Sequence, residues 1–420
     1  MSNTEKYDWV VVGGGIVGII IAEILTREGY KVALVEKNEQ LAGETTRDFH
    51  EWIHTGALYT LIPDKGKTMR FLLGAIDDLI EFYGGFKGMN LVPTEKGLQI
   101  ADSDRGWFNK NYIHFHFRIT NRKLTFPWVI GVSRAIFLLE KLKHHDWLRR
   151  RAGEFKSEFN YKTIVTKSLE LLRYKSKFFN YKTSDFTTNS RNLLTEILYN
   201  AMNNGLKLSL NNAYVSHSKD ANGYHIQGEN ESFIADNLVF ASGKNIAKLV
   251  DSTVKTSYAP MAVVSNIKAD DTSFVELDYF PKNCINLLTK DGKVGLIGGI
   301  SFNRLEECDP YIEEVIAKHK IYNPELIVHH KYVGIKSEII LKGQPRNYLF
   351  HILTLKDGAL AIIPGKFTLA FSIGPEFFRR IYKRNPMKQI KTGQNTKYTF
   401  EEVRKFVSNT VWQDFQKDNN

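Results

Sequence analysis

The sequence predicts an α/β fold in which a nucleotide-binding domain with a mainly parallel sheet is joined to an α+β domain with a mostly antiparallel sheet. Two features predict it. Near the N-terminus an apolar strand passes through a glycine-rich turn into a helical stretch and a second apolar strand, and residues 256–344 contain several short segments that alternate apolar and polar side chains. The first pattern is typical of parallel sheets and the second of antiparallel ones. With 420 residues, the chain is long enough to bury two cores.

The glycine-rich turn carries the clearest functional signal. After the strand of residues 9–12, the turn reads Gly13, Gly14, Gly15, Ile16, Val17 and Gly18. Gly13 permits a tight turn, Gly15 lets the backbone approach a pyrophosphate, and Gly18 lets the helix pack closely on the strand. The helix would direct its first N–H groups at phosphate. Glu36 ends the second strand, where a carboxylate accepts hydrogen bonds from ribose hydroxyls and repels the 2′-phosphate of NADP. The unit is therefore Rossmann-like, and FAD and NAD are its candidate ligands.

The remaining elements of this domain follow from apolar spacing. Helical spacing predicts helices over residues 66–82 and 191–203, the second ending at Asn204 and Gly205. Short apolar runs predict strands at residues 213–216, 223–226, 233–235, 236–243 and 359–363. The last strand leads through residues 364–368 into an apolar helical run, so a second helix N-terminus is expected to face the ligand.

The order of these elements divides the chain into discontinuous domains. We assign residues 1–95, 185–255 and 345–400 to the nucleotide-binding domain, residues 96–184 and 256–344 to a substrate (cap) domain, and residues 401–420 to a C-terminal tail. Residues 96–184 are rich in aromatic and basic residues and contain no second nucleotide fingerprint, which places them on the substrate side.

Cysteine content and hydropathy exclude several classes of protein. The two cysteines, Cys284 and Cys308, are too few for a disulfide scaffold or a cysteine metal cluster, and a cytoplasmic location is the expectation. The apolar stretch at residues 9–25 contains the turn glycines and Glu23. It therefore indicates a buried strand and helix, not a membrane span or a signal sequence.

The net charge of +11 is unevenly distributed. Residues 141–182 contain twelve Lys or Arg against four Asp or Glu, and residues 377–400 contain seven basic residues and no acidic one. Such faces attract anionic lipid, nucleic acid or an acidic substrate, although a simply solvated basic surface is commoner. Because no nucleic-acid fold signature accompanies the charge, peripheral membrane contact is favoured over nucleic-acid binding.

Four segments together resemble the FAD-dependent oxidoreductases of the D-amino-acid oxidase superfamily. These segments are residues 13–18 with Glu36 and Lys37, residues 52–59, residues 240–243 and residues 364–368. The superfamily includes glycerol-3-phosphate dehydrogenases, 2-hydroxyglutarate oxidases and dimethylglycine or sarcosine dehydrogenases. Residues 53–59, followed by Pro63 and Lys67, look most like the 2-hydroxyglutarate oxidases, whereas residues 364–368 look like the Gly-Gly-Lys-x-Thr turn of the glycerol-3-phosphate dehydrogenases. Lys336 stands where the glycerophosphate enzymes tend to carry an arginine.

The resemblance implies that the ligand is FAD, with its adenosine at Glu36 and Val215, its pyrophosphate over the glycine turn and its isoalloxazine near His54. The implied cofactor-binding residues are Gly13, Gly14, Gly15, Ile16, Val17, Gly18, Glu36, Lys37, Thr45, Thr46, Val215, Ala241, Gly243, Gly365, Lys366, Phe367 and Thr368. The helix N-terminus after residues 364–368, together with Lys366, would stabilise negative charge that develops at flavin N1 and the C2 carbonyl during reduction.

His54 and Lys366 are the candidate catalytic residues. His54 can accept a proton near neutral pH, so it could remove the hydroxyl or amine proton of a substrate while the hydride moves to flavin N5. In the dimethylglycine-type relatives a similarly placed histidine is attached covalently to the flavin, and a packing histidine is the third interpretation. His50 is a weaker candidate for the same role.

Tyr59, Lys336 and Arg346 are the candidate substrate-binding residues. Lys336 and Arg346 would donate charge-assisted hydrogen bonds to a carboxylate or phosphate, and Tyr59 could orient the substrate through its phenol. The ordinary alternatives are an exposed lysine and arginine and a tyrosine that packs in the core.

The sequence therefore predicts an FAD-dependent dehydrogenase or oxidase that acts on a small anionic substrate, such as a 2-hydroxy acid or a polyol phosphate, with oxygen, a quinone or another molecule as electron acceptor. An amine oxidase or N-methyl amino-acid dehydrogenase, and a flavin-binding scaffold without turnover, are the alternatives. The sequence contains no zinc-ligand spacing, Walker A loop or Gly-x-Ser-x-Gly elbow, so no metal site is predicted and hydrolase and kinase chemistry are disfavoured.

Overall fold

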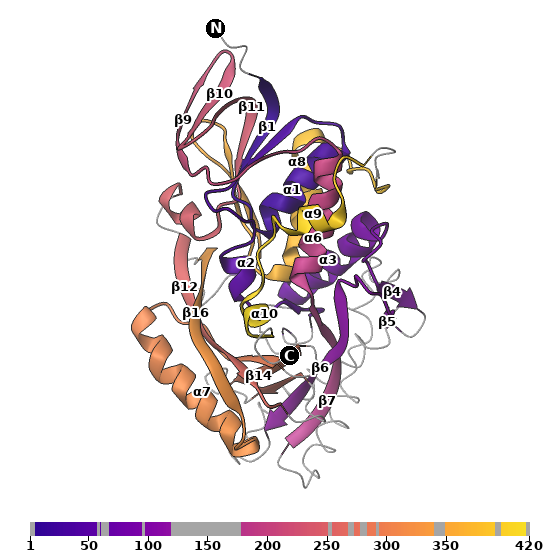
Figure 1. Ribbon diagram of the computed structural model, residues 1–420, viewed down its shortest axis with the longest axis vertical. Helices are drawn as coiled ribbons and strands as arrows, with labels where there is room; N and C mark the ends of the chain where they lie inside the picture. The colour runs from indigo at the N-terminus through magenta and orange to yellow at the C-terminus, as the bar shows by residue number, and fades with distance from the viewer. Residues whose placement is uncertain are drawn as a thin grey trace.

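The computed structural model describes residues 5–56, 59, 67–94, 97–118, 178–250, 254–267, 273–277, 284–290, 294–339, 349–390 and 396–416. In these residues the strands form two eight-stranded sheets and one two-stranded sheet, β4 (Leu91–Thr94) with β5 (Gly97–Ile100). The two large sheets lie toward opposite ends of an elongated molecule, and a layer of helices lies beside one of them (Figure 1). This α/β architecture is the one that the sequence predicts.

The first large sheet, called here the parallel sheet, is built around the strand that precedes the glycine turn. Its parallel strands are, in spatial order, β8 (Lys207–Ser209), β2 (Val32–Val35), β1 (Lys6–Val12), β11 (Ser232–Phe240) and β18 (Leu360–Ile363). Strand β17 (His351–Thr354) borders β18, and the hairpin of β9 (Tyr214–Asp220) and β10 (Gly223–Gly228) extends from β11; all three pair in antiparallel fashion. Strand β2, which follows β1 in the chain, lies on one side of β1, and the later strand β11 lies on the other side. Open α/β sheets bind their ligands at such a point, where the strand order reverses.

Strand β11 corrects one prediction. The sequence indicates a strand at residues 233–235 and another at residues 236–243, but the structure has one strand, which pairs with β1 over residues 234–240. Two polar side chains of this strand are compensated by β1: Asp236 pairs with Lys6 at 2.5 Å, and Asn237 donates to a backbone carbonyl of the same strand.

Four helices form the layer beside the parallel sheet (Figure 1). They are α1 (Ile16–Arg27), α3 (Lys67–Tyr83), α6 (Ser190–Asn203) and α8 (Ala370–Tyr382). Helices α3 and α6 confirm the helices predicted from apolar spacing. Helix α1 is buried along its length because α6 and α8 both pack on it. Inside this layer Arg27 pairs with Glu23 at 2.5 Å and donates to the carbonyl of Phe82, so both buried charges are compensated.

The second large sheet, called here the antiparallel sheet, is built mainly from residues of the predicted substrate domain. Its order is β16 (Ile327–Ile339), β12 (Val254–Ser265), β15 (Val294–Gly298), β14 (Ile285–Lys290), β13 (Phe274–Leu277), β6 (Phe108–Arg118), β7 (Phe178–Thr188) and β3 (Trp52–Ile53). All neighbours are antiparallel except β13 and β6. Helix α7 (Cys308–Tyr322) packs on one face through Ile312 and Val315. Alternate side chains point to the opposite face, which turns toward the parallel sheet.

Residues 401–416, within the predicted C-terminal tail, are a packed part of the structure. Helix α9 (Phe400–Arg404) contacts α6, and α10 (Val411–Gln416) packs on β12 and β15. Val411 and Trp412 join an apolar cluster with Val263 and Leu296 of the antiparallel sheet. The end of the chain thus connects the helix layer to the antiparallel sheet.

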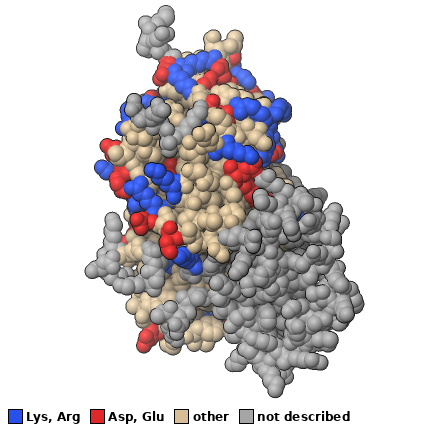
Figure 2. All heavy atoms as spheres, turned by 90° about the vertical axis from the view of Figure 1, so that its right-hand side faces the viewer, with Lys and Arg blue, Asp and Glu red and all other residues tan. Residues whose placement is uncertain are grey.

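The basic segment at residues 377–400 is largely ion-paired in its described part. Its pairs are Arg379 and Arg380 with Glu376, Arg384 with Glu28, and Lys388 with Glu81. Figure 2 shows the described Lys and Arg side chains interspersed with Asp and Glu on one face. Residues 141–177 of the other basic segment lie outside the described residues, and peripheral membrane contact stays a prediction. None of the helices in the described ranges is both long and apolar enough to cross a membrane.

Candidate active site

A cavity of about 710 Å³ is lined by both large sheets. It extends from the glycine turn and Glu36 on the parallel sheet to Asn286 and Lys336 on the antiparallel sheet, and it reaches His54. The cavity therefore joins the predicted nucleotide site to the predicted catalytic residue.

The glycine turn has the geometry that the sequence predicts. Gly13 has a left-handed φ of 111°, and a Cβ atom there would lie 2.6 Å from the carbonyl oxygen of Ala241. A Cβ on Gly18 would lie 1.8 Å from the carbonyl oxygen of Gly13, so the turn and α1 approach too closely for any side chain. At Gly15 the nearest atom would be Thr46 Oγ1 at 3.4 Å, which leaves open space for a phosphate beside the start of the helix.

Glu36 is held by the backbone around it. Its carboxylate accepts hydrogen bonds from the N–H of Gly14 at 2.7 Å and of Asn38 at 3.0 Å. Burial raises the pKa of the Glu36 carboxyl, while these two N–H groups act to lower it. A carboxylate has about four acceptor positions, so two remain for ribose hydroxyls.

Helix α2 (Thr45–Asp48) closes the cavity over the start of α1. Thr46 Oγ1 accepts a hydrogen bond from the N–H of Ile16 at 3.2 Å, and Thr45 donates to the carbonyl of Ile335 at 2.7 Å. The two threonines therefore connect the phosphate side of the cavity to β16.

His54 is buried where the cavity meets the antiparallel sheet. Its backbone N–H donates to Thr368 Oγ1 at 2.8 Å, and the centre of its ring lies 4.3 Å from that of Trp52. Its Nδ1 atom lies 3.5 Å from a carboxylate oxygen of Asp185, with no closer hydrogen-bond partner among the described residues. Burial lowers the pKa of His54, Asp185 acts to raise it, and Lys366 and Lys336 act to lower it further. The imidazole is therefore neutral at physiological pH and able to accept a proton.

Asp185 is a functional candidate that the sequence analysis missed. Its side chain is fully buried, and its carboxylate accepts hydrogen bonds from Trp52 Nε1 at 3.0 Å, from Thr55 N–H at 2.8 Å and from the Thr55 hydroxyl at 2.6 Å. These donors fix the carboxylate beside His54. It comes from β7, 131 positions away along the chain, so no local motif marks it.

The lysines and Tyr59 occupy different positions around His54. Lys336 and Lys366 both line the cavity. Lys336 pairs with Glu338 at 2.8 Å, and Lys366 Nζ lies 5.7 Å from the centre of the Tyr59 ring. Tyr59 is buried outside the cavity lining, with its ring edge-on to His54 at 5.3 Å.

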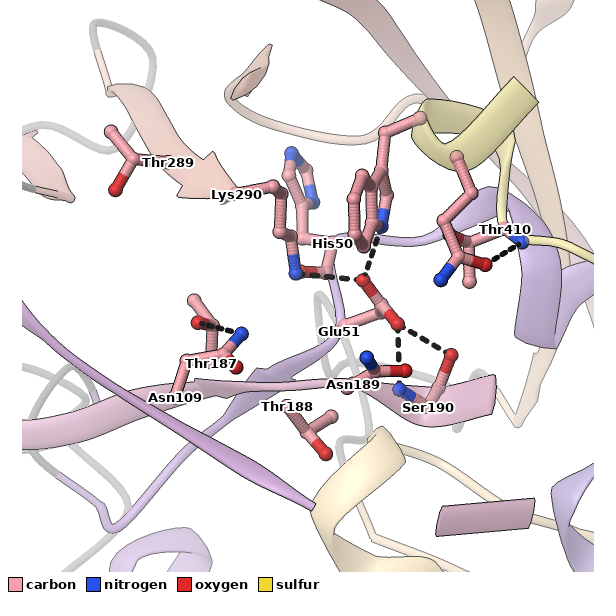
Figure 3. Close-up of polar contacts among 12 residues, drawn as sticks. His50, Glu51, Asn109, Thr187, Thr188, Asn189, Ser190, Thr289, Lys290 and Thr410 are labelled. Carbon is pink, nitrogen blue, oxygen red and sulfur yellow. Dashed lines mark hydrogen bonds and ion pairs between the residues drawn. The ribbon is translucent and has the colours of Figure 1, made fainter. Parts of the chain in front are cut away.

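A buried polar cluster next to His50 was also missed (Figure 3). Glu51 has a left-handed φ of 54°, and its carboxylate accepts hydrogen bonds from Lys290 at 2.7 Å, Trp412 Nε1 at 2.6 Å and the N–H of Ser190 at 2.8 Å. The side chains of Glu51 and Lys290 are fully buried. The cluster ties the segment between His50 and His54 to β14, α6 and α10. Its members are up to 361 positions apart, which hides them from sequence patterns.

The structure brings most of the predicted site residues to this one cavity. Those that line it are Gly13, Gly14, Gly15, Ile16, Val17, Glu36, Lys37, Thr45, Thr46, His54, Val215, Ala241, Gly243, Lys336, Gly365, Lys366 and Phe367. Gly18 and Thr368 lie behind the lining, and Arg346 lies outside the described residues. The open backbone at Gly15 and the ordered Glu36 carboxylate fit the pyrophosphate and ribose of FAD. The role of each residue stays a prediction.

Similar folds occur among solved structures of flavin enzymes. L-alpha-glycerophosphate oxidase from Mycoplasma pneumoniae, solved with FAD bound, superposes with a TM-score of 0.61 at 18% identity, covering 94% of this chain and 98% of that one. Glycine oxidase from Geobacillus kaustophilus gives 0.58 at 14% identity, covering 93% and 100%. L-proline dehydrogenase from P. horikoshii gives 0.62 at 15% identity, covering 92% and 96%. At these identities the likeness establishes the fold.

Sequence comparison supplies the family. No curated protein sequence matched this chain. The family model described as FAD dependent oxidoreductase matches residues 8–318, which contain the glycine turn, Glu36 and His54. The chain therefore belongs to the FAD dependent oxidoreductase family, and it is an enzyme whose cofactor is FAD.

Proposed function

We propose that this enzyme oxidises a small anionic substrate, a 2-hydroxy acid or a polyol phosphate, with His54 as the proton acceptor. The observation that carries the proposal is the placement of the His54 imidazole in the same cavity as the glycine turn, where Lys336 and Lys366 also line the wall. Burial lowers the pKa of this imidazole, which favours its neutral form. When bound, FAD supplies the hydride acceptor, flavin N5.

The lysines explain why the substrate is expected to be anionic. Both act to lower the pKa of His54, so their positive charge reaches the imidazole through the buried end of the cavity. The same field attracts a carboxylate or phosphate. Because Lys336 is already paired with Glu338, an anion would join this pair and would not meet an isolated cation.

His54 is suited to take the substrate proton. The hydroxyl proton passes to the imidazole as the hydride leaves the same carbon, so the alcohol becomes a carbonyl and two electrons leave the substrate. Asp185 faces Nδ1, which leaves the Nε2 edge of the ring for the substrate. Oxygen, a quinone or another molecule then receives the electrons.

Amine oxidation is the second candidate function. Glycine oxidase and L-proline dehydrogenase, whose names denote amino-acid substrates, share this fold over more than 90% of both chains. A neutral imidazole could also take a proton from an ammonium group before hydride transfer.

Anaerobic stopped-flow reduction of the holoenzyme tests the proposal. Hydroxy acids and polyol phosphates should bleach the flavin faster than secondary amines and amino acids, and His54→Gln should slow the bleaching about 100-fold or more. Unchanged reduction by His54→Gln would remove the assigned role. Faster reduction by amines would favour the second candidate, and retained FAD that no compound reduces would contradict both.

A further inference from the structure

Five buried polar atoms of residues that line the cavity have no hydrogen-bond partner among the described residues: His54 Nδ1, Ser242 Oγ, Ser337 Oγ, His50 Nε2 and Asn286 Oδ1. The last two belong to residues that meet on the antiparallel sheet. Asn286 is 3% exposed. The sequence analysis named His50 only as a weaker candidate proton acceptor and did not name Asn286. Burying a polar atom without a partner is unfavourable, so such atoms in a cavity point to a ligand that bonds to them.

Both residues meet the same face of the antiparallel sheet, at Gly298. Gly298 of β15 is directly opposite Asn286 of β14, and a Cβ on Gly298 would lie 2.9 Å from His50 Nε2. The imidazole nitrogen therefore occupies the space that a side chain at Gly298 would fill. Directly opposite residues have Cβ atoms about 5 Å apart, which places the Asn286 amide next to the ring.

The chemistry of the pair is complementary. Burial, followed by the charge of Lys290, lowers the pKa of His50 to about 3, so the ring is neutral and has one N–H donor. Asn286 Oδ1 is an acceptor only. The strand beneath it is held in place because His319 of α7 contacts the backbone carbonyl of Asn286 at 3.2 Å. A group that both accepts and donates would satisfy both atoms.

We propose that His50 and Asn286 form a recognition site for a second hydroxyl group of the substrate, distinct from the one that is oxidised. That hydroxyl accepts a hydrogen bond from His50 Nε2–H and donates one to Asn286 Oδ1. This inference rests on the proposed function and narrows it to polyhydroxy acids and polyol phosphates.

Pairs of probes that differ by one hydroxyl test the site. We would compare glycerate with lactate, and glycerol 3-phosphate with propane-1,2-diol 1-phosphate, in calorimetric binding to the holoenzyme and in anaerobic flavin reduction. The wild-type enzyme should prefer the hydroxylated member of at least one pair by about 10-fold or more, because a site built for a hydroxyl rejects the analogue that lacks it.

Two variants and a control separate this site from general damage. In Asn286→Leu and His50→Phe the preference should fall to within about 3-fold of unity. Thr289→Val changes a buried side chain three residues further along β14, where Thr289 bonds to Ser273 on the opposite face of the sheet, and the preference should remain.

The outcomes distinguish this inference from the proposed function. Hydroxyl-selective binding without flavin reduction would support the site and contradict the proposed oxidation. Equal binding of both members of each pair by the wild-type enzyme, or no binding of any probe, would overturn the site. Loss of FAD from Asn286→Leu at unchanged thermal stability would also overturn it, because His50 and Asn286 would then belong to the FAD-binding site.

Discussion

At the scale of single residues, the nucleotide site requires glycines at positions where a Cβ atom would clash with the backbone. The closest approach in the glycine turn is at Gly18, where a Cβ would lie 1.8 Å from a backbone oxygen. A backbone atom cannot move aside as a flexible side chain can, so the turn would have to open. This requirement is local and could be predicted from the spacing of the glycines.

Replacement of this glycine should therefore abolish cofactor binding. Gly18→Ala should be purified without FAD or not fold, as measured by visible absorption and thermal unfolding. Gly74→Ala in α3 is the matched control, because nothing lies within 4 Å of the added methyl group. It should keep FAD and gain up to about 1 kcal/mol of stability, since alanine favours helix over glycine. Full FAD content in Gly18→Ala would contradict the close-packing argument.

Asp185 gives a second prediction at this scale. In Asp185→Asn, flavin reduction should slow by about 100-fold because the imidazole is less well oriented. Asp185 acts to raise the pKa of His54, so its loss should move the acid limb of the rate profile to lower pH. In both proteins the acid limb should lie below the ordinary pKa of histidine, because burial lowers the pKa of His54. A slower variant with an unmoved limb would show that Asp185 acts only on the fold.

At the scale of elements, the loop between α2 and β3 is held from outside the cavity. Lys290 of β14, Ser190 of α6 and Trp412 of α10 all bond to Glu51 in this loop (Figure 3). Three elements thus fix the backbone between the two cavity histidines. The left-handed φ of Glu51 is compatible with this anchoring, since a strained residue persists when its surroundings determine it.

Removing one partner of the buried Glu51–Lys290 pair should destabilise the protein more than removing both partners. Glu51→Gln leaves the Lys290 charge buried without its partner and should lower the free energy of unfolding by about 3–5 kcal/mol. The double variant Glu51→Gln/Lys290→Met removes that charge and should recover most of the loss. Denaturant unfolding of the three proteins measures both steps. Additive losses in the double variant would contradict a direct pairing.

At the scale of the whole molecule, buried neutral histidines make stability depend on pH. Burial lowers the pKa of His319, between α7 and the antiparallel sheet, to about 4. Between about pH 6.5 and pH 4 the unfolded chain binds this proton and the folded protein does not. Stability contributed by this residue is therefore lost as the pH falls through that window. Asp48 and Asp78 act in the opposite sense, because burial raises the pKa of each to about 6.

A single substitution isolates the histidine effect. The difference in unfolding free energy between the wild-type protein and His319→Gln should change by about 3 kcal/mol between pH 7 and pH 4, with the wild type relatively weaker in acid. The two aspartates are present in both proteins and cancel. Urea unfolding at several pH values measures the difference, and a pH-independent difference would contradict a buried neutral His319.

The sequence by itself determined the α/β class, the glycine turn with Glu36 and the region of His54, because each depends on residues close together in the chain. The tertiary structure alone decided which distant residues meet: Asp185 lies beside His54, three elements anchor Glu51, and Asn286 and His50 meet the same face of the antiparallel sheet. It also decided that the described basic residues of the segment 377–400 are largely ion-paired. The physical reason is the same in each case, since hydrogen bonds and charges act over a few ångströms of space and are indifferent to the hundreds of positions that separate them along the chain.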